Sequence, residues 1–233
     1  MRAKISVCLA IHNGERFLQQ QIESIIPQLN GNDEIICSDD HSTDQSIPIL
    51  ESFHDARIKI TKPSSSGSHV RNFEHALNRC TGDFIFLSDH DDIWNDHKVD
   101  LMSGHLIDHH LVLSDCSMID ENNLELAPSL FKIQKTKSGI IKNWIKNTYT
   151  GCCMAFRKEI LTKALPFPEG IRAHDQWIGL IAEKYYSVYL LPETLVKYRR
   201  HKNNFSSTGD KSKLTWLDQL CSRVTLVKSL SFR

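Results

Sequence analysis

The chain has 233 residues, enough for one large domain or two small ones with a substantial core. Its 28 Lys and Arg residues balance 28 Asp and Glu residues, so the formal net charge is zero. This balance gives no support to a general nucleic-acid-binding protein, which usually carries a basic excess. The hydrophobic fraction of 40% and the charged fraction of 24% are those of an ordinary soluble globular protein.

The sequence also argues against a membrane-spanning or disulfide-bonded protein. No apolar run reaches the roughly 18–20 residues that a spanning helix needs. The apolar run near the start ends at His12-Asn13-Gly14 and is too short for the core of a signal peptide, so we interpret it as a strand. The seven cysteines are scattered and odd in number, which favours reduced thiols in a cytoplasmic protein over disulfides or a zinc site.

In the first part of the chain, short apolar segments alternate with segments of helical periodicity. The pattern predicts, in order, a strand (4–11), a helix (16–26), a strand (33–37), a helix that Asp44 can cap (44–54), a strand (57–61), a helix (70–80) and a strand (84–89). This alternation indicates βαβ units around a parallel sheet. In such sheets a ligand lies beyond the carboxyl ends of the strands.

The second part of the chain is less regular. It predicts a helix (98–110), a strand (111–114), a long loop or lid (119–140), a helix (141–149), a strand (151–156), two helices (158–165 and 175–186) and two strands (187–191 and 195–199). From residue 211 onward, apolar residues recur at helical spacing, which predicts an amphipathic helical tail. The tail can contact a membrane, pack on its own domain or bind a partner.

Two acidic clusters follow predicted strands, and therefore belong to the same edge of the sheet. One is Asp39-Asp40, and the other is the Asp89-His90-Asp91-Asp92 run in FIFLSDHDDIW. An Asp-x-Asp at a strand end offers hard oxygen ligands that suit Mg²⁺ or Mn²⁺ and a bound diphosphate. The alternative is a solvated acidic turn that caps Asn95 or the next helix.

Three further segments carry groups that suit chemistry at this edge. An aspartate in SDDHSTD (38–44) can accept a hydrogen bond from a base or a ribose, or the segment is only a capped loop. Asp175 in AHDQW is either a helix N-cap or a general base. YRRHKNN (198–204) is either a solvated basic loop or a clamp for a diphosphate formed by Arg199, Arg200, His201 and Lys202, and His201 can also ligate a metal.

Several segments recur in a familiar order and spacing, namely AIHNGERFLQQQIESI, IICSDDHSTD, GSHVRNFEHALNRCTGDFIFLSDHDDIW, GCCMAFRKE, AHDQW and YRRHKNN. Together, over about residues 4–206, they resemble the family 2 glycosyltransferases with the GT-A fold, in particular the bacterial polysaccharide, rhamnosyltransferase-like branch. The resemblance implies an α/β fold with a Rossmann-like, mostly parallel central sheet flanked by helices, and a C-terminal helical tail. It implies one domain over 1–210, with a nucleotide-binding half (about 1–95) and an acceptor-binding half (96–210), followed by the tail (211–233).

The resemblance also assigns roles to individual positions. Nucleotide-sugar contacts are expected from Ala10, His12, Asn13, Glu15, Asp39, Asp40, Arg71, Asp89, His90 and Arg199. Asp39 is expected at the base, Arg71 at the base or phosphates, and Asp89 at the ribose. Metal ligands are expected from Asp91, Asp89 and His201, and the catalytic base is expected to be Asp175. His90 and His41 depart from the family pattern, and a positive φ at His41, where Gly is common, would strain the backbone.

The function implied is an inverting glycosyl transfer that depends on Mn²⁺ or Mg²⁺. The donor would be a UDP- or dTDP-sugar, and the acceptor a glycan, linked to a lipid carrier, in O-antigen or capsule assembly. The enzyme would be cytoplasmic, with the tail as a peripheral contact to the inner membrane. Two other functions share part of the pattern. A sugar-nucleotidyltransferase would need a Gly-rich basic loop, of which AIHNGER is a poor version, and a non-catalytic sugar-nucleotide-binding protein would lose the base or the metal ligands.

Overall fold

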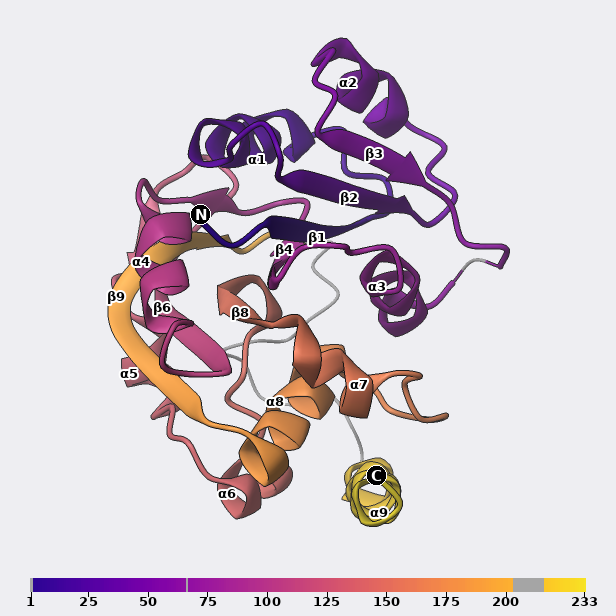
Figure 1. Ribbon diagram of the computed structural model, residues 1–233, viewed down its shortest axis with the longest axis vertical. Helices are drawn as coiled ribbons and strands as arrows, with labels where there is room; N and C mark the ends of the chain where they lie inside the picture. The colour runs from indigo at the N-terminus through magenta and orange to yellow at the C-terminus, as the bar shows by residue number, and fades with distance from the viewer. Residues whose placement is uncertain (1, 66, 203–215) are drawn as a thin grey trace.

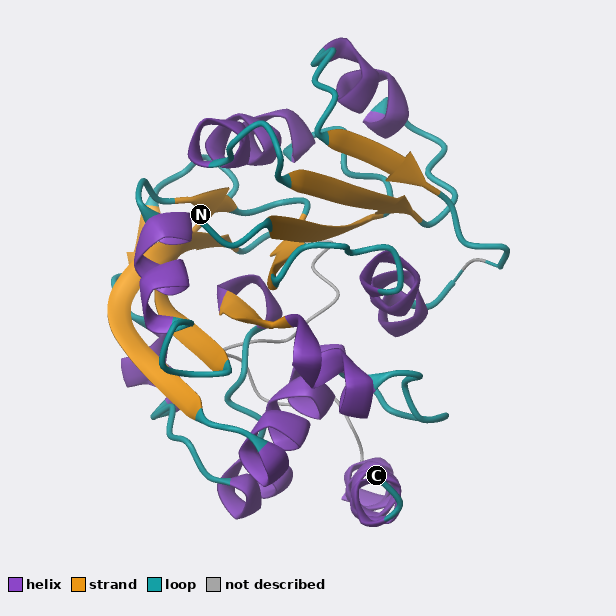
Figure 2. Ribbon diagram, viewed as in Figure 1, coloured by secondary structure: helices purple, strands orange, loops and turns teal. Residues whose placement is uncertain are grey.

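A single curled sheet runs through the protein and carries helices on both of its faces (Figures 1 and 2). The computed structural model describes residues 2–65, 67–202 and 216–233. Within this part of the chain the strands follow the order β3-β2-β1-β4-β8-β6-β9-β5, and β7 pairs with β6. The α/β class expected from the alternating pattern is confirmed.

The first half of the sheet is parallel, as the βαβ pattern predicts. It comprises β1 (Ile5–Ile11), β2 (Glu34–Asp39), β3 (Ile58–Thr61) and β4 (Phe84–Asp89). Every residue of β1 is buried, because β1 lies between β2 and β4 and both of its faces are covered. The helices of this half are α1 (Leu18–Ile25), α2 (Ser46–Ser52) and α3 (His69–Leu77).

The chain reverses its direction across the sheet between β1 and β4. The units β1-α1-β2 and β2-α2-β3 progress one way, and α3 then returns the chain to β4 on the other side of β1. Right-handed crossovers therefore put α1 and α2 on one face and α3 on the opposite face, as Figure 1 shows. Such a reversal opens a crevice at the carboxyl ends of the two strands.

The second half of the sheet is mixed. It contains β5 (Ile93–Trp94), β6 (Leu111–Ile119), β7 (Glu125–Ala127), β8 (Met154–Arg157) and the long β9 (Val188–Arg199). Of the eight strand pairs in the described residues, four are parallel and four are antiparallel. The sequence predicted a mostly parallel sheet, and this is true of the first half, whereas the second half is mixed. The predicted strands 187–191 and 195–199 form one strand, whose pairing with β6 shifts register at Ser114 and Asp115.

The segment 119–140, predicted as a loop, contains regular structure. It holds β7 and α5 (Leu130–Gln134), and it is anchored by Asp115. The Asp115 carboxylate accepts hydrogen bonds from Ser129 Oγ and from the Phe131 amide. The remaining α-helices are α4 (Lys98–His105), α6 (Ile140–Ile145), α7 (Leu161–Ala164) and α8 (His174–Tyr185), with 3₁₀ turns at Ile26–Gln28, Gly151–Cys153 and Lys158–Ile160.

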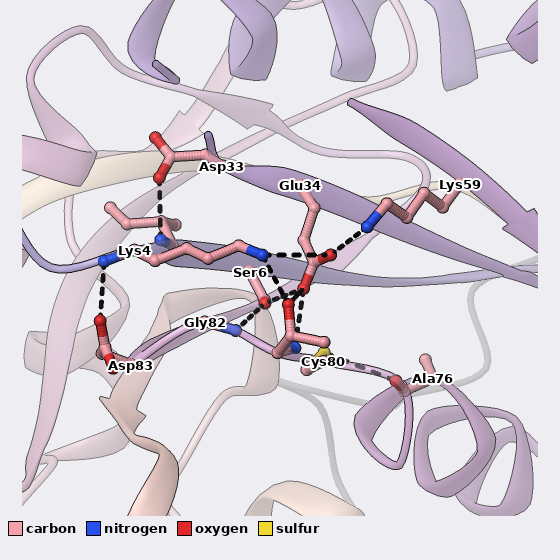
Figure 3. Close-up of polar contacts among 11 residues, drawn as sticks. Lys4, Ser6, Asp33, Glu34, Lys59, Ala76, Cys80, Gly82 and Asp83 are labelled. Atoms are coloured by element: carbon pink, nitrogen blue, oxygen red, sulfur yellow. Dashed lines mark hydrogen bonds and ion pairs between the residues drawn. The ribbon is translucent and has the colours of Figure 1, made fainter. Parts of the chain in front are cut away.

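Glu34 fastens the amino-terminal edge of the parallel strands (Figure 3). Its buried carboxylate accepts hydrogen bonds from Ser6 Oγ and Lys59 Nζ, each at 2.6 Å, and from the Thr81 amide at 2.7 Å. Burial opposes ionisation, but the hydrogen bonds outweigh it and lower the pKa of Glu34 to about 2. A Cβ at Gly82 would lie 2.6 Å from the Ser6 nitrogen, so only glycine fits beside this network.

The C-terminal helix α9 (Trp216–Ser231) packs on the domain. Leu226 and Leu230 are buried, and Arg223 exchanges hydrogen bonds with α6, accepting from Trp144 Nε1 at 3.0 Å and donating to the Ile145 carbonyl at 2.8 Å. The start of the predicted tail, 211–215, lies outside the described residues. None of the helices in the described segments is long and apolar enough to cross a membrane.

Candidate active site

A cavity of about 530 Å³ opens at the carboxyl ends of β1 and β4, where the chain reverses direction. Predicted site residues that line it are Ala10, His12, Asn13, Asp40, Asp89, His90, Asp91 and His201. The structure therefore brings the first-strand lip, the Asp-x-Asp run and the late loop to one place, as their positions at strand ends predict.

Asp40, and not Asp39, is the acidic residue of the first cluster that lines the cavity. Asp40 accepts a hydrogen bond from the Gly67 amide at 3.0 Å, which ties the loop before α3 to the rim. The Asp39 carboxylate accepts from the Ser42 amide and closes its own turn. His41 lies inside that turn at φ 59°, so the position does require a left-handed backbone, as its match to a common glycine suggests.

Glu15 and Asn13 join two loops at the rim. Glu15 accepts from the Gln45 amide at 3.0 Å and donates its own amide to Asp44. Asn13 Oδ1 accepts from the Thr43 amide at 2.9 Å, although the residue also lines the cavity. The structure thus gives Glu15 a role in positioning the loop, while Asn13 keeps a position from which it can contact a ligand.

Arg71 is turned away from the cavity. Its guanidinium donates to the Phe167 carbonyl at 3.0 Å and pairs with Glu74, so it connects α3 with the segment after α7. The structure does not place Arg71 among the residues that line the cavity. The expected contact with the base or phosphates is therefore not supported by this arrangement.

Asp91 and His201 form a pair at the cavity wall, with Asp91 Oδ2 and His201 Nε2 2.9 Å apart. Burial opposes the ionisation of Asp91, but the hydrogen bond from His201 and the nearby imidazole of His90 outweigh it and lower the pKa of Asp91. His90 packs so closely on Gly14 that a Cβ there would lie 2.7 Å from its ring. Gly14 is therefore needed for the loop to pass over the Asp-x-Asp run.

The two other carboxylates of the acidic run, Asp89 and Asp92, have too little positive charge around them to favour their ionised forms. Burial and the charges of Asp92 and Asp91 raise the pKa of Asp89 well above its usual value. Burial and the charge of Asp91 likewise raise the pKa of Asp92 to about 7, although the Arg199 amide donates to it and Lys98 lies near. A bound cation at this wall would stabilise the carboxylate forms, so the donor set fits a divalent metal.

Two groups of residues can offer ligands to such an ion. Asp91 and His201 combine a carboxylate with an imidazole on the cavity wall, and Asp89 is the neighbouring carboxylate there. Ligand atoms of Asp89, Asp92 and Cys152 also lie within 4.8 Å of one another. The hydrogen bond with Cys153 and burial raise the pKa of the Cys152 thiol, which disfavours the thiolate that a metal requires. Mg²⁺ and Mn²⁺ also prefer oxygen ligands.

Arg199 is buried and lies outside the set of residues that line the cavity, so this arrangement does not support its expected role as a diphosphate clamp. Its guanidinium donates to the Asp91 carbonyl at 2.7 Å, to Asn123 Oδ1 at 2.7 Å and to Gln20 Oε1 at 2.9 Å. It also lies 4.4 Å from the centre of the Phe17 ring. Arg199 therefore fixes the Asp-x-Asp loop against β9 and α1 from behind.

Asp175 lies in the first turn of α8, outside the set of residues that line the cavity. Its carboxylate accepts from its neighbour's amide, Gln176 N, at 2.6 Å and from Asn147 Nδ2 at 3.4 Å. Burial outweighs these hydrogen bonds and raises the pKa of Asp175 to about 6. A carboxylate with this pKa is ionised at neutral pH yet basic enough to accept a proton.

Sequence reasoning missed an aromatic stack between the cavity and Asp175. His69 lines the cavity, and its ring lies 5.0 Å from Phe73 and 5.2 Å from His174, while Phe73 and His174 stack at 3.8 Å. Burial lowers the pKa of His69 to about 4, so this ring is neutral at pH 7. The sequence predicted a helix only from residue 70 onward and gave no signal for the histidine just before it.

Arg16, Asn72 and Tyr198 also line the cavity, although sequence reasoning assigned none of them a contact with the ligand. Asn72 is the most constrained of them, because it donates to the Ile11 carbonyl at 3.1 Å and accepts from Ser38 Oγ at 2.5 Å. It therefore holds the ends of β1 and β2 together from α3. Arg16 instead is largely exposed and pairs with Glu121.

The sheet, with its parallel half and its mixed half, matches the GT-A fold of solved glycosyltransferase structures. TarS residues 1–349 from S. aureus, in complex with UDP-GlcNAc, aligns with a TM-score of 0.77 at 17% identity, covering 97% of this chain and 66% of that chain. The mannosyltransferase PcManGT from Pyrobaculum calidifontis, in complex with GDP-Man and Mn²⁺, aligns at 0.69 and 16% identity, covering 100% and 75%. At these low identities, the structural matches establish the fold alone.

The sequence comparisons add the family. Glycosyl transferase family 2 matches residues 6–165, and the chain belongs to this family. It is 29% identical over 214 residues to dTDP-rhamnosyl transferase RfbG of Shigella flexneri, covering 84% of this chain and 72% of the relative. It is 26% identical over 222 residues to the putative teichuronic acid biosynthesis glycosyltransferase TuaG of Bacillus subtilis, covering 91% and 85%. The family expected from the motifs is confirmed.

Proposed function

We propose that the protein transfers a sugar from a UDP- or dTDP-sugar to a hydroxyl of a glycan acceptor in bacterial surface polysaccharide assembly. The observation that carries the proposal is the Asp91–His201 pair on a cavity at the carboxyl ends of β1 and β4. The named relatives support the substrate class, since one is called a dTDP-rhamnosyl transferase and another a teichuronic acid biosynthesis glycosyltransferase. The TarS structure, which holds UDP-GlcNAc, supports a nucleotide-sugar donor.

Asp91 and His201, with Asp89 beside them, would hold Mn²⁺ or Mg²⁺. A divalent ion at this position supplies stabilisation of the negative charge that develops on the leaving diphosphate. The protein's own contribution is to hold the two ligands together before any ion binds, because the pair is already within hydrogen-bond distance. Arg199 supports this arrangement through its bond to the Asp91 carbonyl.

Asp175 would act as the general base. Its carboxylate removes the proton of the acceptor hydroxyl, whose oxygen attacks the anomeric carbon opposite the nucleotide, so the product has inverted configuration. Asn147 and the Gln176 amide orient the carboxylate, and its pKa of about 6 leaves it ionised in a neutral cytoplasm. Because Asp175 lies in α8 and outside the residues that line the cavity, the acceptor would bind beside α8 and the nucleotide would bind in the cavity.

An acceptor on a lipid carrier would be reached from a membrane surface, and α6 and α9 offer a suitable face. Their exposed apolar side chains are Ile141, Ile145, Val224 and Val227, accompanied by the exposed Lys142, Lys146 and Lys228. The contact between Trp144 and Arg223 joins the two helices. Apolar side chains mixed with lysines suit the surface of an anionic membrane, which would make the enzyme peripheral on the cytoplasmic face.

Vesicle sedimentation tests this membrane face. The protein should sediment with phosphatidylglycerol-rich vesicles more than with phosphatidylcholine vesicles. A variant with Ile145→Glu and Val224→Glu should lose this preference. Leu124→Glu with Leu126→Glu is the matched control, because those leucines are also exposed but belong to β7 and the residue before it, not to α6 or α9. Equal sedimentation of both variants would remove the membrane contact from the proposal.

Calorimetric titration tests the central proposal. UDP and dTDP are titrated into the protein in Mn²⁺, in Mg²⁺ and in EDTA. Binding of one nucleotide that weakens in EDTA is expected, and it would leave the sugar to a screen of donors. If neither nucleotide binds under any condition, the cavity does not serve a nucleotide-sugar and the proposal fails.

A further inference from the structure

Arg16 is the only arginine or lysine that lines the cavity in the described part of the chain. The same wall carries the carboxylates of Asp40, Asp89 and Asp91. A donor diphosphate would bring further negative charge to this wall. A permanent cation at the cavity is therefore the group that a diphosphate most needs there, besides a divalent ion.

The side chain of Arg16 is placed near the proposed metal ligands. Its guanidinium carbon lies 4.9 Å from the centre of the Phe17 ring, and that ring lies 5.2 Å from the ring of His201. His201 in turn contacts Asp91. These contacts link Arg16 through Phe17 and His201 to Asp91, beside which the diphosphate would meet the metal.

Arg16 has a partner that it can give up at little cost. Its Nη1 lies 2.7 Å from Glu121 Oε2, and the two side chains are 58% and 47% exposed. Exposed ion pairs of this kind contribute about 0–1 kcal/mol, because water screens the charges. A phosphate group in the cavity competes well for the same guanidinium, since arginine binds phosphate oxygens through two parallel hydrogen bonds.

We propose that Arg16 binds the diphosphate of the donor, and that it exchanges the Glu121 carboxylate for phosphate oxygens when the donor enters. This inference rests on the proposed function, because it assumes a nucleotide-sugar in the cavity. Glu121 holds the guanidinium at the rim in the absence of donor. Arg16 thereby takes the role that the sequence suggested for Arg199, whose own guanidinium is occupied behind the cavity wall.

Calorimetry with the nucleotide that wild type binds tests the proposal. Arg16→Ala should weaken binding of the nucleoside diphosphate roughly 10- to 100-fold, the value of a lost charge-assisted hydrogen bond or two. It should leave binding of the phosphate-free nucleoside unchanged. Glu121→Gln should tighten diphosphate binding by up to about fivefold, since it removes the competitor. In the Arg16→Ala background, Glu121→Gln should have no effect.

Arg172→Ala is the matched control, because Arg172 forms a similarly exposed pair with Asp218, at 3.1 Å, away from the cavity. It should bind the nucleotide as wild type does. If wild type binds nucleotide and Arg16→Ala binds it equally well, the Arg16 inference is overturned while the proposed function stands. The inference is also overturned if Arg16→Ala changes only the KM of the acceptor. If wild type binds no nucleotide, the proposed function itself fails and takes the inference with it.

Discussion

His201 Nε2 lies 2.9 Å from Asp91 Oδ2, although 110 residues separate the two in the chain. The pairing of β9 with β5 brings them together, because only Asp92 separates Asp91 from β5 and only Arg200 separates β9 from His201. The sheet itself therefore assembles the pair. A carboxylate and an imidazole held in this way need little rearrangement to bind an ion.

His201→Ala should therefore weaken the Mn²⁺-dependent part of nucleotide binding by about 10- to 100-fold. Nucleotide binding in EDTA should change little. The measurement is a pair of calorimetric titrations with and without metal. His97→Asn is the control, because His97 is exposed, lies at φ 65° and tolerates asparagine in that conformation. Full metal dependence in His201→Ala would point instead to the Asp89, Asp92 and Cys152 group.

Asp175→Asn should abolish transfer and spare donor binding, since asparagine can keep the hydrogen bonds from Gln176 and Asn147 but cannot accept a proton. In wild type, the rate should fall as the pH drops through about 6, because protonation of Asp175 removes the base. The checks are a rate profile between pH 5 and 8 and a nucleotide titration of the variant. Unchanged turnover in Asp175→Asn would assign the base to another residue.

The same carboxyl should also make stability depend on pH. The pKa of Asp175 is about 6 in the fold against about 3.9 in an unfolded chain, so the folded state holds its proton more tightly. This contribution to stability is present below pH 4 and is lost as the pH rises to about 6. Asp175→Asn should therefore melt above wild type at pH 7.5, and the gap should close towards pH 4. A gap independent of pH would contradict the raised pKa.

Much of the site was predictable because strand ends are predictable. The alternating pattern located the ends of β1, β2 and β4, and the carboxylates Asp40, Asp89 and Asp91 at those ends do line the cavity. His201, which was expected from YRRHKNN and the family resemblance, follows β9 and also lines the cavity. The period of the hydrophobic pattern is local, so a single sequence suffices to place such residues at the correct edge.

The direction of each side chain was not predictable, because distant partners decide it. Arg199 turns inward since Gln20 and Asn123 accept from it, 179 and 76 residues away in the chain. Arg71 turns toward Phe167, 96 residues away. Likewise, the buried Asp115 carboxylate holds Ser129 and Phe131 within 119–140, and local patterning could not single it out.

Gly151 offers a test of how closely the base must be held. A Cβ at this position would lie 2.9 Å from His174 Nε2 and 3.7 Å from the Asp175 Cβ. His174 is buried and stacked on Phe73, so it cannot simply turn away. Gly151→Ala should therefore displace the start of α8 and lower kcat by up to about 100-fold, the cost of a small misplacement of a catalytic group. The affinity for nucleotide should stay near that of wild type.

Gly104→Ala is the matched control for this change. Gly104 lies within α4, and nothing is within 4 Å of an added Cβ. The substitution should leave kcat unchanged and stabilise the fold by about 0.5–1 kcal/mol, because alanine favours the helix over glycine. Steady-state kinetics and thermal unfolding of both variants provide the comparison. Equal kcat values would mean that the approach of Gly151 to His174 has no part in placing the base.

Substitutions at Arg199 and Arg16 should have different effects. A change at Arg199 should lower the stability of the fold, whereas a change at Arg16 should weaken diphosphate binding and leave stability nearly unchanged. Arg199→Lys leaves the acceptors at Gln20 and Asn123 without a partner of matching shape, because the ammonium cannot span the positions of a guanidinium. Unfolding in urea should show a loss of about 2–4 kcal/mol, the cost of two buried hydrogen bonds. Arg16→Ala should change stability by less than about 0.5 kcal/mol, since Arg16 is exposed. A stable Arg199→Lys variant with selectively impaired diphosphate binding would restore Arg199 as the clamp.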